Sequence, residues 1–163
     1  MDNFIRLDYK FDLDLLKKDL YNVINTAGWG DKHQICLTHR PESESWFEGG
    51  GSFILHKDYT VMNKFLNDSY YEEVHNTLIK DYPFGRVRLM LLHGQRCYSL
   101  HADTTKRIHI PIETNDQCLM IIDDEVKRMP ADGSAWLTNT TKPHTALNGN
   151  LIFDRVHLLF DLV

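Results

Sequence analysis

The sequence predicts a mostly β protein in which flanking helices support a double-stranded β-helix, the jelly-roll core also found in cupins. Two amphipathic, helix-like segments lie before residue 85, and a series of short β-rich runs follows it. Turn-forming residues separate these runs at close spacing. Many short strands at such spacing are typical of sandwiches and barrels, whereas alternating strands and helices would indicate a parallel sheet.

The length of 163 residues fits a single domain. Within it, we expect residues 1–84 to form a helical and strand support that also contacts the substrate. Residues 85–163, where the short β-rich runs lie, are expected to form the jelly-roll core. Such a chain is long enough to bury a sizeable hydrophobic core.

Charge and hydropathy exclude several kinds of partner. The formal net charge is -5 without a long run of Lys and Arg, so we expect no nucleic-acid partner. No apolar stretch approaches the roughly 18–20 residues that span a bilayer, so we expect no membrane partner. The N-terminus lacks an apolar signal segment, and the three cysteines are an odd number without a CxxC pair. We therefore expect a cytoplasmic protein with reduced thiols.

The N-terminal half predicts two helices and one strand. An apolar stripe at helical spacing marks residues 11–26, and Gly28 follows as a stop signal. A second amphipathic segment covers residues 68–81 and ends before a proline. Residues 33–39 have the composition of a strand. The polar, Gly-rich segment 41–51 follows that strand as a loop and a candidate lid over a binding site.

The C-terminal half predicts short strands throughout. Turn signals such as HGQ, DTTK, ETND, ADG and NGN separate runs that are rich in β-branched and aromatic residues. The Asn148-Gly149 pair is a hairpin marker, so we expect a hairpin at that point. The predicted strands are residues 86–92, 96–101, 107–112, 117–122, 125–129, 134–138, 143–147 and 154–161.

Two of these strands combine an apolar face with a cationic face. Side chains alternate between the faces of a strand, so Arg107 and His109 of RIHIPI lie opposite three isoleucines. In DRVHLLF, Arg155 and His157 likewise lie opposite Val, Leu and Phe side chains. Unpaired buried charge costs several kcal/mol, so we expect these cations to line a cavity that holds an anion.

A metal-ligand pattern lies beside the first of these strands. His101 and Asp103 stand two residues apart, where the DTTK turn begins, and His144 supplies a second imidazole from a distant strand. Two imidazoles and one carboxylate with open positions opposite them form the facial triad of non-haem Fe(II) oxygenases. Arg155 stands one strand further on, where its planar guanidinium suits the distal carboxylate of 2-oxoglutarate.

Each of these residues also has a structural explanation, which the sequence leaves open. His101 is compatible with a surface histidine, and Asp103 with a cap on the DTTK turn. Arg107 and Arg155 are compatible with structural ion pairs, and His109 with a hydrogen-bonded core histidine. The metal hypothesis depends on the ordered set, because no single member of it is specific.

Three ordered segments, HADTTKRIHIPIE, GSAWLTNTTKPHTALN and DRVHLLFD, resemble the aspartyl/asparaginyl β-hydroxylase family. They are also similar to the bacterial free-proline hydroxylases near that family. The resemblance covers residues 85–162 and implies a 2-oxoglutarate-dependent Fe(II) dioxygenase on a jelly-roll core. The mammalian aspartyl hydroxylase branch lacks the carboxylate ligand, so Asp103 favours a likeness to the bacterial members.

The resemblance implies a role for each residue of the pattern. Arg155 is expected to bind the distal carboxylate of 2-oxoglutarate. Arg107 and His109 match an R-x-H strand that helps to hold the cosubstrate or a substrate carboxylate. The implied ligands of the catalytic Fe(II) are His101, Asp103 and His144.

The expected function is hydroxylation of an unactivated C–H bond with Fe(II), 2-oxoglutarate and O2. The expected substrate is a small-molecule amino acid, or an Asp, Asn or Pro residue in a peptide or protein, with an anionic group that Arg107 and Arg40 could contact. Two alternatives stay open: a cupin-like metal-binding hydrolase or isomerase, and a non-catalytic jelly-roll module that binds a ligand. The sequence does not indicate an oligomeric state.

Overall fold

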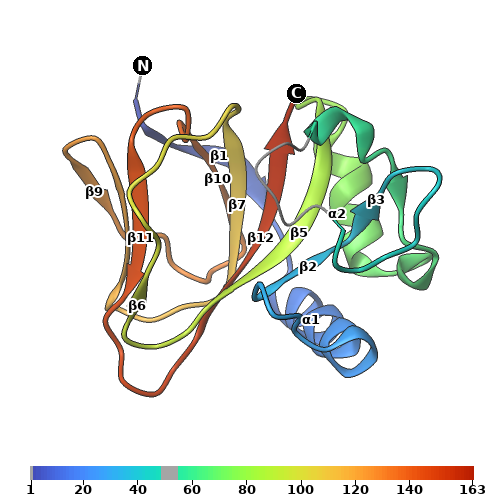
Figure 1. Cartoon of the computed structure of the whole chain (residues 1–163), viewed down its shortest axis with the longest axis horizontal. Coiled ribbons are helices and arrows are strands. Elements are labelled where there is room, and N and C mark those ends of the chain that lie inside the picture. The colour runs from blue at the N-terminus through green and yellow to red at the C-terminus, as the bar shows by residue number, and fades with distance from the viewer. Residues whose placement is uncertain (1, 49–54) are drawn as a thin grey trace.

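The structure combines antiparallel sheets with α-helices (Figure 1). It is a computed structural model, and it describes residues 2–48 and 55–163. The helices are α1 (Leu13–Ala27) and α2 (Tyr70–Leu78), with short 3-10 turns η1 (His56–Asp58) and η2 (Lys64–Leu66). The strands are β1 (Phe4–Lys10), β2 (Gln34–Cys36), β3 (Thr38–His39), β4 (Val61–Met62), β5 (Phe84–Leu92), β6 (Arg96–Cys97), β7 (Arg107–Glu113), β8 (Cys118–Ile122), β9 (Glu125–Lys127), β10 (Ser134–Thr138), β11 (His144–Asn148) and β12 (Arg155–Leu162).

The strands form a large sheet and a small sheet. The large sheet has six strands in the order β1-β10-β7-β12-β5-β2, and the small sheet has four in the order β6-β11-β8-β9. The short strands β3 and β4 pair with each other, and every described strand pair is antiparallel. Figure 1 shows the small sheet on one side of the large sheet and both helices on the other. This arrangement confirms the predicted mostly β fold with flanking helices.

Helix α1 confirms the helix predicted at residues 11–26. Asp12 caps its N-terminus, where the side chain accepts hydrogen bonds from Asp14 N and Leu15 N. These bonds satisfy backbone donors that have no partner inside the helix. Gly28 ends the helix at φ 67°, a left-handed conformation that glycine adopts without strain.

Helix α2 occupies the middle of the predicted segment 68–81. Ser69 precedes it, and its hydroxyl oxygen accepts a hydrogen bond from Glu72 N at 3.2 Å. The carboxylate of Asp19 on α1 is buried and accepts a hydrogen bond from Tyr71 N at 2.9 Å. A carboxylate at a helix N-terminus also interacts favourably with the helix dipole, so Asp19 joins the two helices there.

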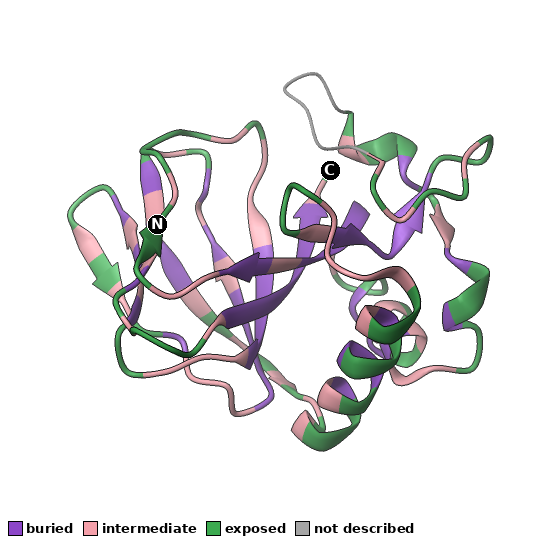
Figure 2. Cartoon of the chain, turned by 60° about the horizontal axis from the view of Figure 1, so that its bottom comes forward, coloured by how far each residue is buried: buried purple, intermediate pink, exposed green. Residues whose placement is uncertain are grey.

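The main hydrophobic core lies between the helices and the outer face of the large sheet. Apolar side chains of β5, β7 and β12 form one buried cluster with those of both helices. The strands at the centre of this sheet are almost continuously buried in Figure 2. The predicted apolar faces of β7 and β12 are therefore confirmed as core. Fully buried members of the cluster include Leu16, Leu78, Leu89, Ile110 and Phe160.

Strand β1 was not predicted from the sequence. It pairs with β10 at the edge of the large sheet, with Phe4 opposite Thr138. From Ile5 onward its residues alternate between less exposed and more exposed positions. The letters FIRLDYK carry the same period of two, which was the available signal.

Two details of the predicted β pattern are wrong. The hairpin expected at Asn148-Gly149 does not form, because β11 belongs to the small sheet and β12 to the large sheet. The connection crosses between the sheets, and the buried Asn148 amide holds it by donating hydrogen bonds to Leu92 O and Phe153 O. The strand predicted at residues 33–39 is divided into β2 and β3, which join different sheets.

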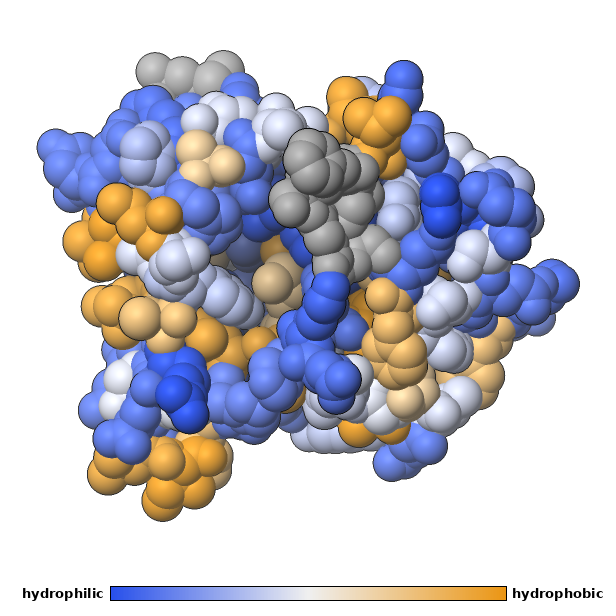
Figure 3. Space-filling view, in the orientation of Figure 1, coloured by the Kyte–Doolittle hydropathy of each residue, from blue (hydrophilic) through white to orange (hydrophobic). Residues whose placement is uncertain are grey.

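Apolar side chains gather on the connection between β11 and β12. Leu151, Ile152 and Phe153 are all exposed there. Figure 3 shows an apolar cluster at its lower left, where Figure 1 places this connection. None of the helices in the described part of the chain is long and apolar enough to cross a membrane.

Replacing Ile110 by alanine tests the position of β7 in the core. Ile110 is fully buried, so its loss should lower the free energy of unfolding by about 2–5 kcal/mol, through lost apolar contacts and a residual cavity. Val126→Ala on β9 is the control, because Val126 is 55% exposed and should change stability by no more than about 0.5 kcal/mol. Urea denaturation followed by circular dichroism measures both, and equally small losses would contradict the assignment.

Candidate active site

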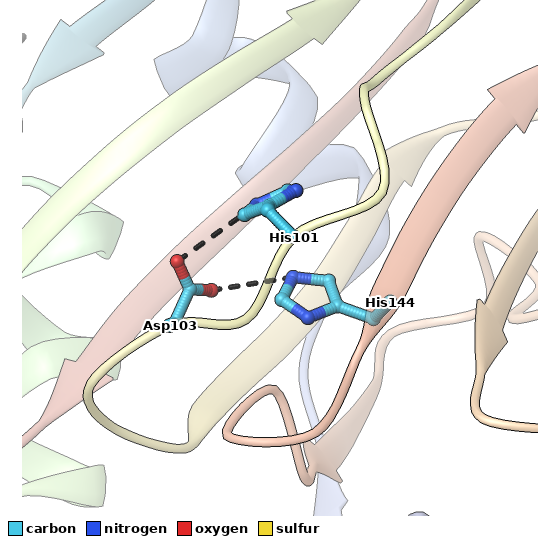
Figure 4. A group of neighbouring side chains, drawn as sticks. All are labelled: His101, Asp103 and His144. Atoms are coloured by element: carbon cyan, nitrogen blue, oxygen red, sulfur yellow. Dashed lines mark ion pairs between the residues drawn. The ribbon is translucent and has the colours of Figure 1, made fainter.

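Two histidines from distant parts of the sequence are held side by side by a backbone bridge (Figure 4). His101 N donates to His144 O at 3.1 Å, and His144 N donates to His101 O at 2.7 Å. The two imidazole ring centroids are 4.4 Å apart. The predicted strand 96–101 is confirmed only in part, since β6 ends at Cys97 and this isolated bridge follows it.

Asp103 completes the cluster from the turn after His101. Its backbone N donates to Thr140 O at 2.8 Å, which fixes the turn. Its Oδ1 lies 3.8 Å from His101 Nε2, and its Oδ2 lies 3.3 Å from His144 Nε2. One ligand atom from each of the three side chains lies within 4.8 Å of the others. The structure thus brings together the three residues that the sequence predicts as metal ligands.

Both imidazole rings are oriented so that Nε2 is available. Nδ1 of His101 lies 2.7 Å from Ser99 O, and Nδ1 of His144 lies 2.9 Å from Lys142 O. A carbonyl oxygen only accepts hydrogen bonds, so each Nδ1 carries the proton and each Nε2 keeps its lone pair. This orientation is usual for metal-binding histidines. Together with the Asp103 carboxylate it gives a donor set that suits Fe(II).

The carboxyl group of Asp103 is held in its ionised form. Burial by itself would raise its pKa, but His144, Arg107 and His101 outweigh burial and lower the pKa. Arg107 Nη1 lies 2.7 Å from Asp103 Oδ2. Despite this contact, Oδ2 is buried without a hydrogen-bond partner among the described residues. An ionised carboxylate that faces two imidazole Nε2 atoms favours a bound cation, so the cluster fits a metal ion.

A cavity of about 220 Å³ lies between the two sheets, beside this cluster. Its volume is below the roughly 300–1,000 Å³ of sites for drug-sized ligands, so it suits a small molecule. Strands β5, β7 and β12 contribute to its wall from the large sheet, and β8 and β11 from the small sheet. The charged and histidine side chains in the wall include Arg88, Arg107, His109, His144 and Arg155.

Arg155 lies in this cavity without a carboxylate partner among the described residues. The residue is only 3% exposed, and its Nη2 lies 2.9 Å from His157 Nδ1. Burial lowers the pKa of Arg155, although a guanidinium keeps its charge at neutral pH. A buried cation without a counter-charge is costly, so this position favours an anionic ligand.

The other residues of the predicted cationic faces have protein partners. Arg107 pairs with Asp103 and with Asp161, whose Oδ1 lies 2.6 Å from Arg107 Nε. His109 Nδ1 lies 3.3 Å from His157 Nδ1 in a T-shaped ring contact. The structural ion pair considered for Arg107 is therefore present, while both Arg107 and His109 also line the cavity.

Two charged residues at or behind the cavity wall were missed from the sequence: Arg88 on β5 lines the cavity, and Asp161 on β12 pairs with the lining residues Arg88 and Arg107. Arg88 Nη1 donates to Gln34 Oε1 at 2.9 Å, and its Nη2 lies 3.4 Å from Asp161 Oδ1. Asp161 has no exposed surface, and its pKa is lowered because Arg88 and Arg107 outweigh the effect of burial. The alternation of Arg and apolar residues in RVRL was the available signal for Arg88.

Arg40 and the described part of the proposed lid do not line the cavity. Arg40 is exposed, and it forms ion pairs with Glu48 and Glu42 rather than lining the cavity. Residues 49–51 of the segment 41–51 predicted as a lid lie outside the described residues. An interaction of Arg40 with a substrate carboxylate therefore has no support from its position.

Solved structures with the same fold include several 2-oxoglutarate-dependent oxygenases. A viral collagen prolyl hydroxylase from Paramecium bursaria Chlorella virus-1, in complex with 2-oxoglutarate, has a TM-score of 0.58 at 11% identity, over 98% of this chain and 95% of that chain. A 2-oxoglutarate-Fe(II) oxygenase family oxidoreductase from Burkholderia pseudomallei also reaches 0.58, at 13% identity, over 98% and 83%. A Pseudomonas putida prolyl-4-hydroxylase reaches 0.55 at 9% identity, over 99% and 93%. At such identities the likeness shows the fold alone, and no curated protein matches the sequence.

These likenesses confirm the double-stranded β-helix, the fold that carries the His-Asp-His cluster here. The sequence adds a family match. Residues 69–163, more than half of the chain, match the family model for aspartyl/asparaginyl beta-hydroxylase. The chain belongs to the aspartyl/asparaginyl β-hydroxylase family, and it is an Fe(II)-dependent dioxygenase of the hydroxylase type.

Two buried histidines, His109 in the cavity wall and His157 in contact with it, predict a loss of stability on acidification. Burial and then the charge of Arg155 lower the pKa of His109 and His157 well below the usual value. Below about pH 6.5 the unfolded chain therefore binds protons that the folded chain does not bind, and the free energy of unfolding falls with pH. Each ring contributes at most about 1.4 kcal/mol per pH unit. Urea denaturation of the metal-free protein between pH 7 and pH 5 measures the slope.

Two variants assign this slope to the buried rings. His109→Gln should show a shallower pH dependence than the wild type, because it removes one of the two groups. His75→Gln on α2 is the control, since His75 lies outside the cavity and is partly exposed. A slope that is unchanged in His109→Gln would show that the buried ring is not the source.

Proposed function

We propose that this protein hydroxylates a carboxylate-bearing amino acid, either free or as a residue of a peptide or protein. The observation that carries the proposal is the presence, around one cavity, of the His101–Asp103–His144 cluster and of a buried arginine without a carboxylate partner. The family supplies the reaction class, because its members use Fe(II) and 2-oxoglutarate to hydroxylate amino acids or protein residues.

The cluster would hold Fe(II) through His101, Asp103 and His144. When bound, Fe(II) supplies the chemistry that uses O2 and 2-oxoglutarate to hydroxylate a C–H bond, with release of succinate and CO2. The chain itself orients two unprotonated Nε2 atoms through carbonyl contacts at Nδ1, and keeps the Asp103 carboxylate ionised. Three ligands from the protein leave the other positions of the metal for cosubstrate and O2.

Arg155 would bind the distal carboxylate of 2-oxoglutarate. It is the buried cation of the cavity that lacks a carboxylate among the described residues, and an incoming carboxylate would relieve that cost. His109 lies in the same cavity, and its Nε2 has no hydrogen-bond partner in the described part of the chain. We therefore propose His109 as a second contact to the cosubstrate. Arg107 already has two carboxylate partners, and we propose that it acts chiefly on Asp103.

The balance of buried charge supports an anionic substrate. Arg88, Arg107 and Arg155 face the interior of the sheets, while the carboxylates that pair there are Asp103 and Asp161. Adding Fe(II) and the doubly negative 2-oxoglutarate leaves this balance with excess positive charge. Arg86, which is also buried, adds to this excess. Since buried charge is costly unless it is compensated, a substrate with a negative group would reduce the excess.

Arg88 is the cation best placed for this substrate group. Its other contacts are the neutral Gln34 and a longer ion pair with Asp161, and its Nε has no hydrogen-bond partner in the described chain. Gln34 and Lys32 line both the cavity and an adjoining hollow beside Phe47. Because these residues belong to the N-terminal half, we propose that residues 1–84 select the substrate.

The complete reaction is the first test of this proposal. With Fe(II), 2-oxoglutarate and O2, the protein should release succinate faster when the right acidic amino acid or peptide is added. His144→Ala should lower this rate by more than about 100-fold, because losing a ligand exceeds the 10–100-fold effects of residues behind the ligands. His75→Ala is the matched control, and anaerobic visible absorption follows the formation of the Fe(II)–2-oxoglutarate complex.

Other outcomes would favour the two remaining classes. Turnover that needs neither Fe(II) nor 2-oxoglutarate would contradict the oxygenase proposal and favour a hydrolase or isomerase. Ligand binding that is unchanged in His101→Ala, together with an absence of turnover, would favour a non-catalytic module.

Two arginine variants should separate the cosubstrate site from the substrate site. Arg155→Gln should raise the KM for 2-oxoglutarate by about 10- to 100-fold, the value of a charge-assisted hydrogen bond. Arg88→Gln should raise the KM for the acidic substrate by a similar factor of about 10- to 100-fold and leave that for 2-oxoglutarate within about twofold. Arg128→Gln, at an exposed ion pair on the surface, is the control. A rise in the same KM for both cavity variants would contradict the two assignments.

A further inference from the structure

Asp161 is a fully buried carboxylate that does not touch the His-Asp-His cluster itself. It lies on β12 directly opposite Arg107 of β7 in the strand register. It has no exposed surface. The cations that face it are Arg107 and Arg88, and the His56 ring, whose pKa is lowered by burial, lies beside it. A buried carboxylate is energetically costly unless nearby cations compensate its charge.

A continuous chain of ion pairs joins Asp161 to the cluster. Asp161 Oδ1 lies 2.6 Å from Arg107 Nε, and Arg107 Nη1 lies 2.7 Å from Asp103 Oδ2. A guanidinium is planar and rigid, so holding it by Nε also determines the direction of its Nη1. Asp161 therefore sets the direction from which Arg107 approaches Asp103.

The direction from which Arg107 approaches determines whether it occupies one or both carboxylate oxygens of Asp103. Arginine readily binds a carboxylate through two parallel N–H groups, which would occupy both carboxylate oxygens. In the structure Asp161 occupies Nε, and the ion pair with Asp103 uses Nη1 and Oδ2 alone. Asp103 Oδ1 then has His101 as its ion-pair neighbour, at 3.8 Å, and stays available to a metal ion.

We propose that Asp161 is a positioning residue for the metal ligand Asp103, and that it acts through Arg107. The inference rests on the proposed function, since it concerns the metal site proposed above. Arg88 Nη2 also contacts Asp161 Oδ1 at 3.4 Å, and His56 Nδ1 lies 3.5 Å from Asp161 Oδ2. Asp161 thereby keeps Arg107 from binding both oxygens of the carboxylate that the metal needs.

Metal affinity is the appropriate readout, because a purely structural role would change stability and leave affinity unchanged. Co(II) chloride, a spectroscopic substitute for Fe(II), is titrated into the metal-free full chain and followed by visible absorption. Asp161→Asn keeps the shape and removes the charge. It should weaken Co(II) binding by about 10-fold or more and alter the absorption spectrum, as expected for a residue behind a ligand. Asp132→Asn, at the partly exposed ion pairs with Arg6 and Lys10, is the matched control and should leave the affinity within about twofold.

A double-mutant cycle tests whether the effect passes through Arg107. In an Arg107→Gln background, Asp161→Asn should cause less than about a twofold further loss, because the intermediate group is already absent. A second tenfold loss in that background would contradict the route. An Asp161→Asn protein that keeps the wild-type Co(II) affinity would contradict the inference itself.

A charge-balanced double variant tests the proposal if Asp161→Asn alone does not fold. Arg88→Gln combined with Asp161→Asn removes one buried positive and one buried negative charge together. It should show the same weakening of Co(II) binding, and Arg88→Gln alone should weaken binding less than the double variant does, because Arg107 keeps Asp161 as its partner. Unchanged Co(II) affinity in the double variant would overturn the proposal.

A wild-type protein whose Co(II) binding is absent, or is unaffected by His144→Ala, would instead refute the metal site and with it the proposed function.

Discussion

The alternation of side chains along β5, β7 and β12 is the constraint on which the rest of the structure depends. Their apolar residues pack with α1 and α2, and their charged residues and histidines point into the space between the sheets. Because successive side chains of a strand point to opposite faces, the same strand register places the apolar residues in the core and the charged residues between the sheets. A slip of one residue would place arginines under the helices and isoleucines in the cavity. The core and the site are therefore specified by the same pairing.

Charge inside the cavity is tolerated because most of it is paired. Asp161 neutralises charge shared by Arg88 and Arg107, and Arg107 also pairs with Asp103. Arg155 differs, since no carboxylate in the described chain pairs with it. The energetic cost of that one cation is what an anionic ligand would remove on binding. The unpaired charge of Arg155 thus both destabilises the folded interior and favours the binding of an anionic ligand.

The cluster depends on contacts between parts of the chain that are distant in sequence. His101 and His144 are joined by reciprocal backbone hydrogen bonds, and Asp103 is tied by its backbone to Thr140. The cavity beside them receives side chains from both sheets and from the N-terminal half, through Lys32 and Gln34. Rigid backbone contacts of this kind hold a site in place before any ligand binds.

From the sequence by itself, the fold class, both helices, the apolar and cationic faces of β7 and β12, and the set His101, Asp103, His144 and Arg155 could be predicted. Those features repeat at short range or in fixed order along the chain. The tertiary structure alone decided the crossing after Asn148, the split of β2 from β3, and the partnership of Arg107 with Asp161. An ion pair between strands depends on which strands are neighbours and on their register. Local periodicity does not contain that information, because it determines which face of a strand is apolar and not which strand lies beside it.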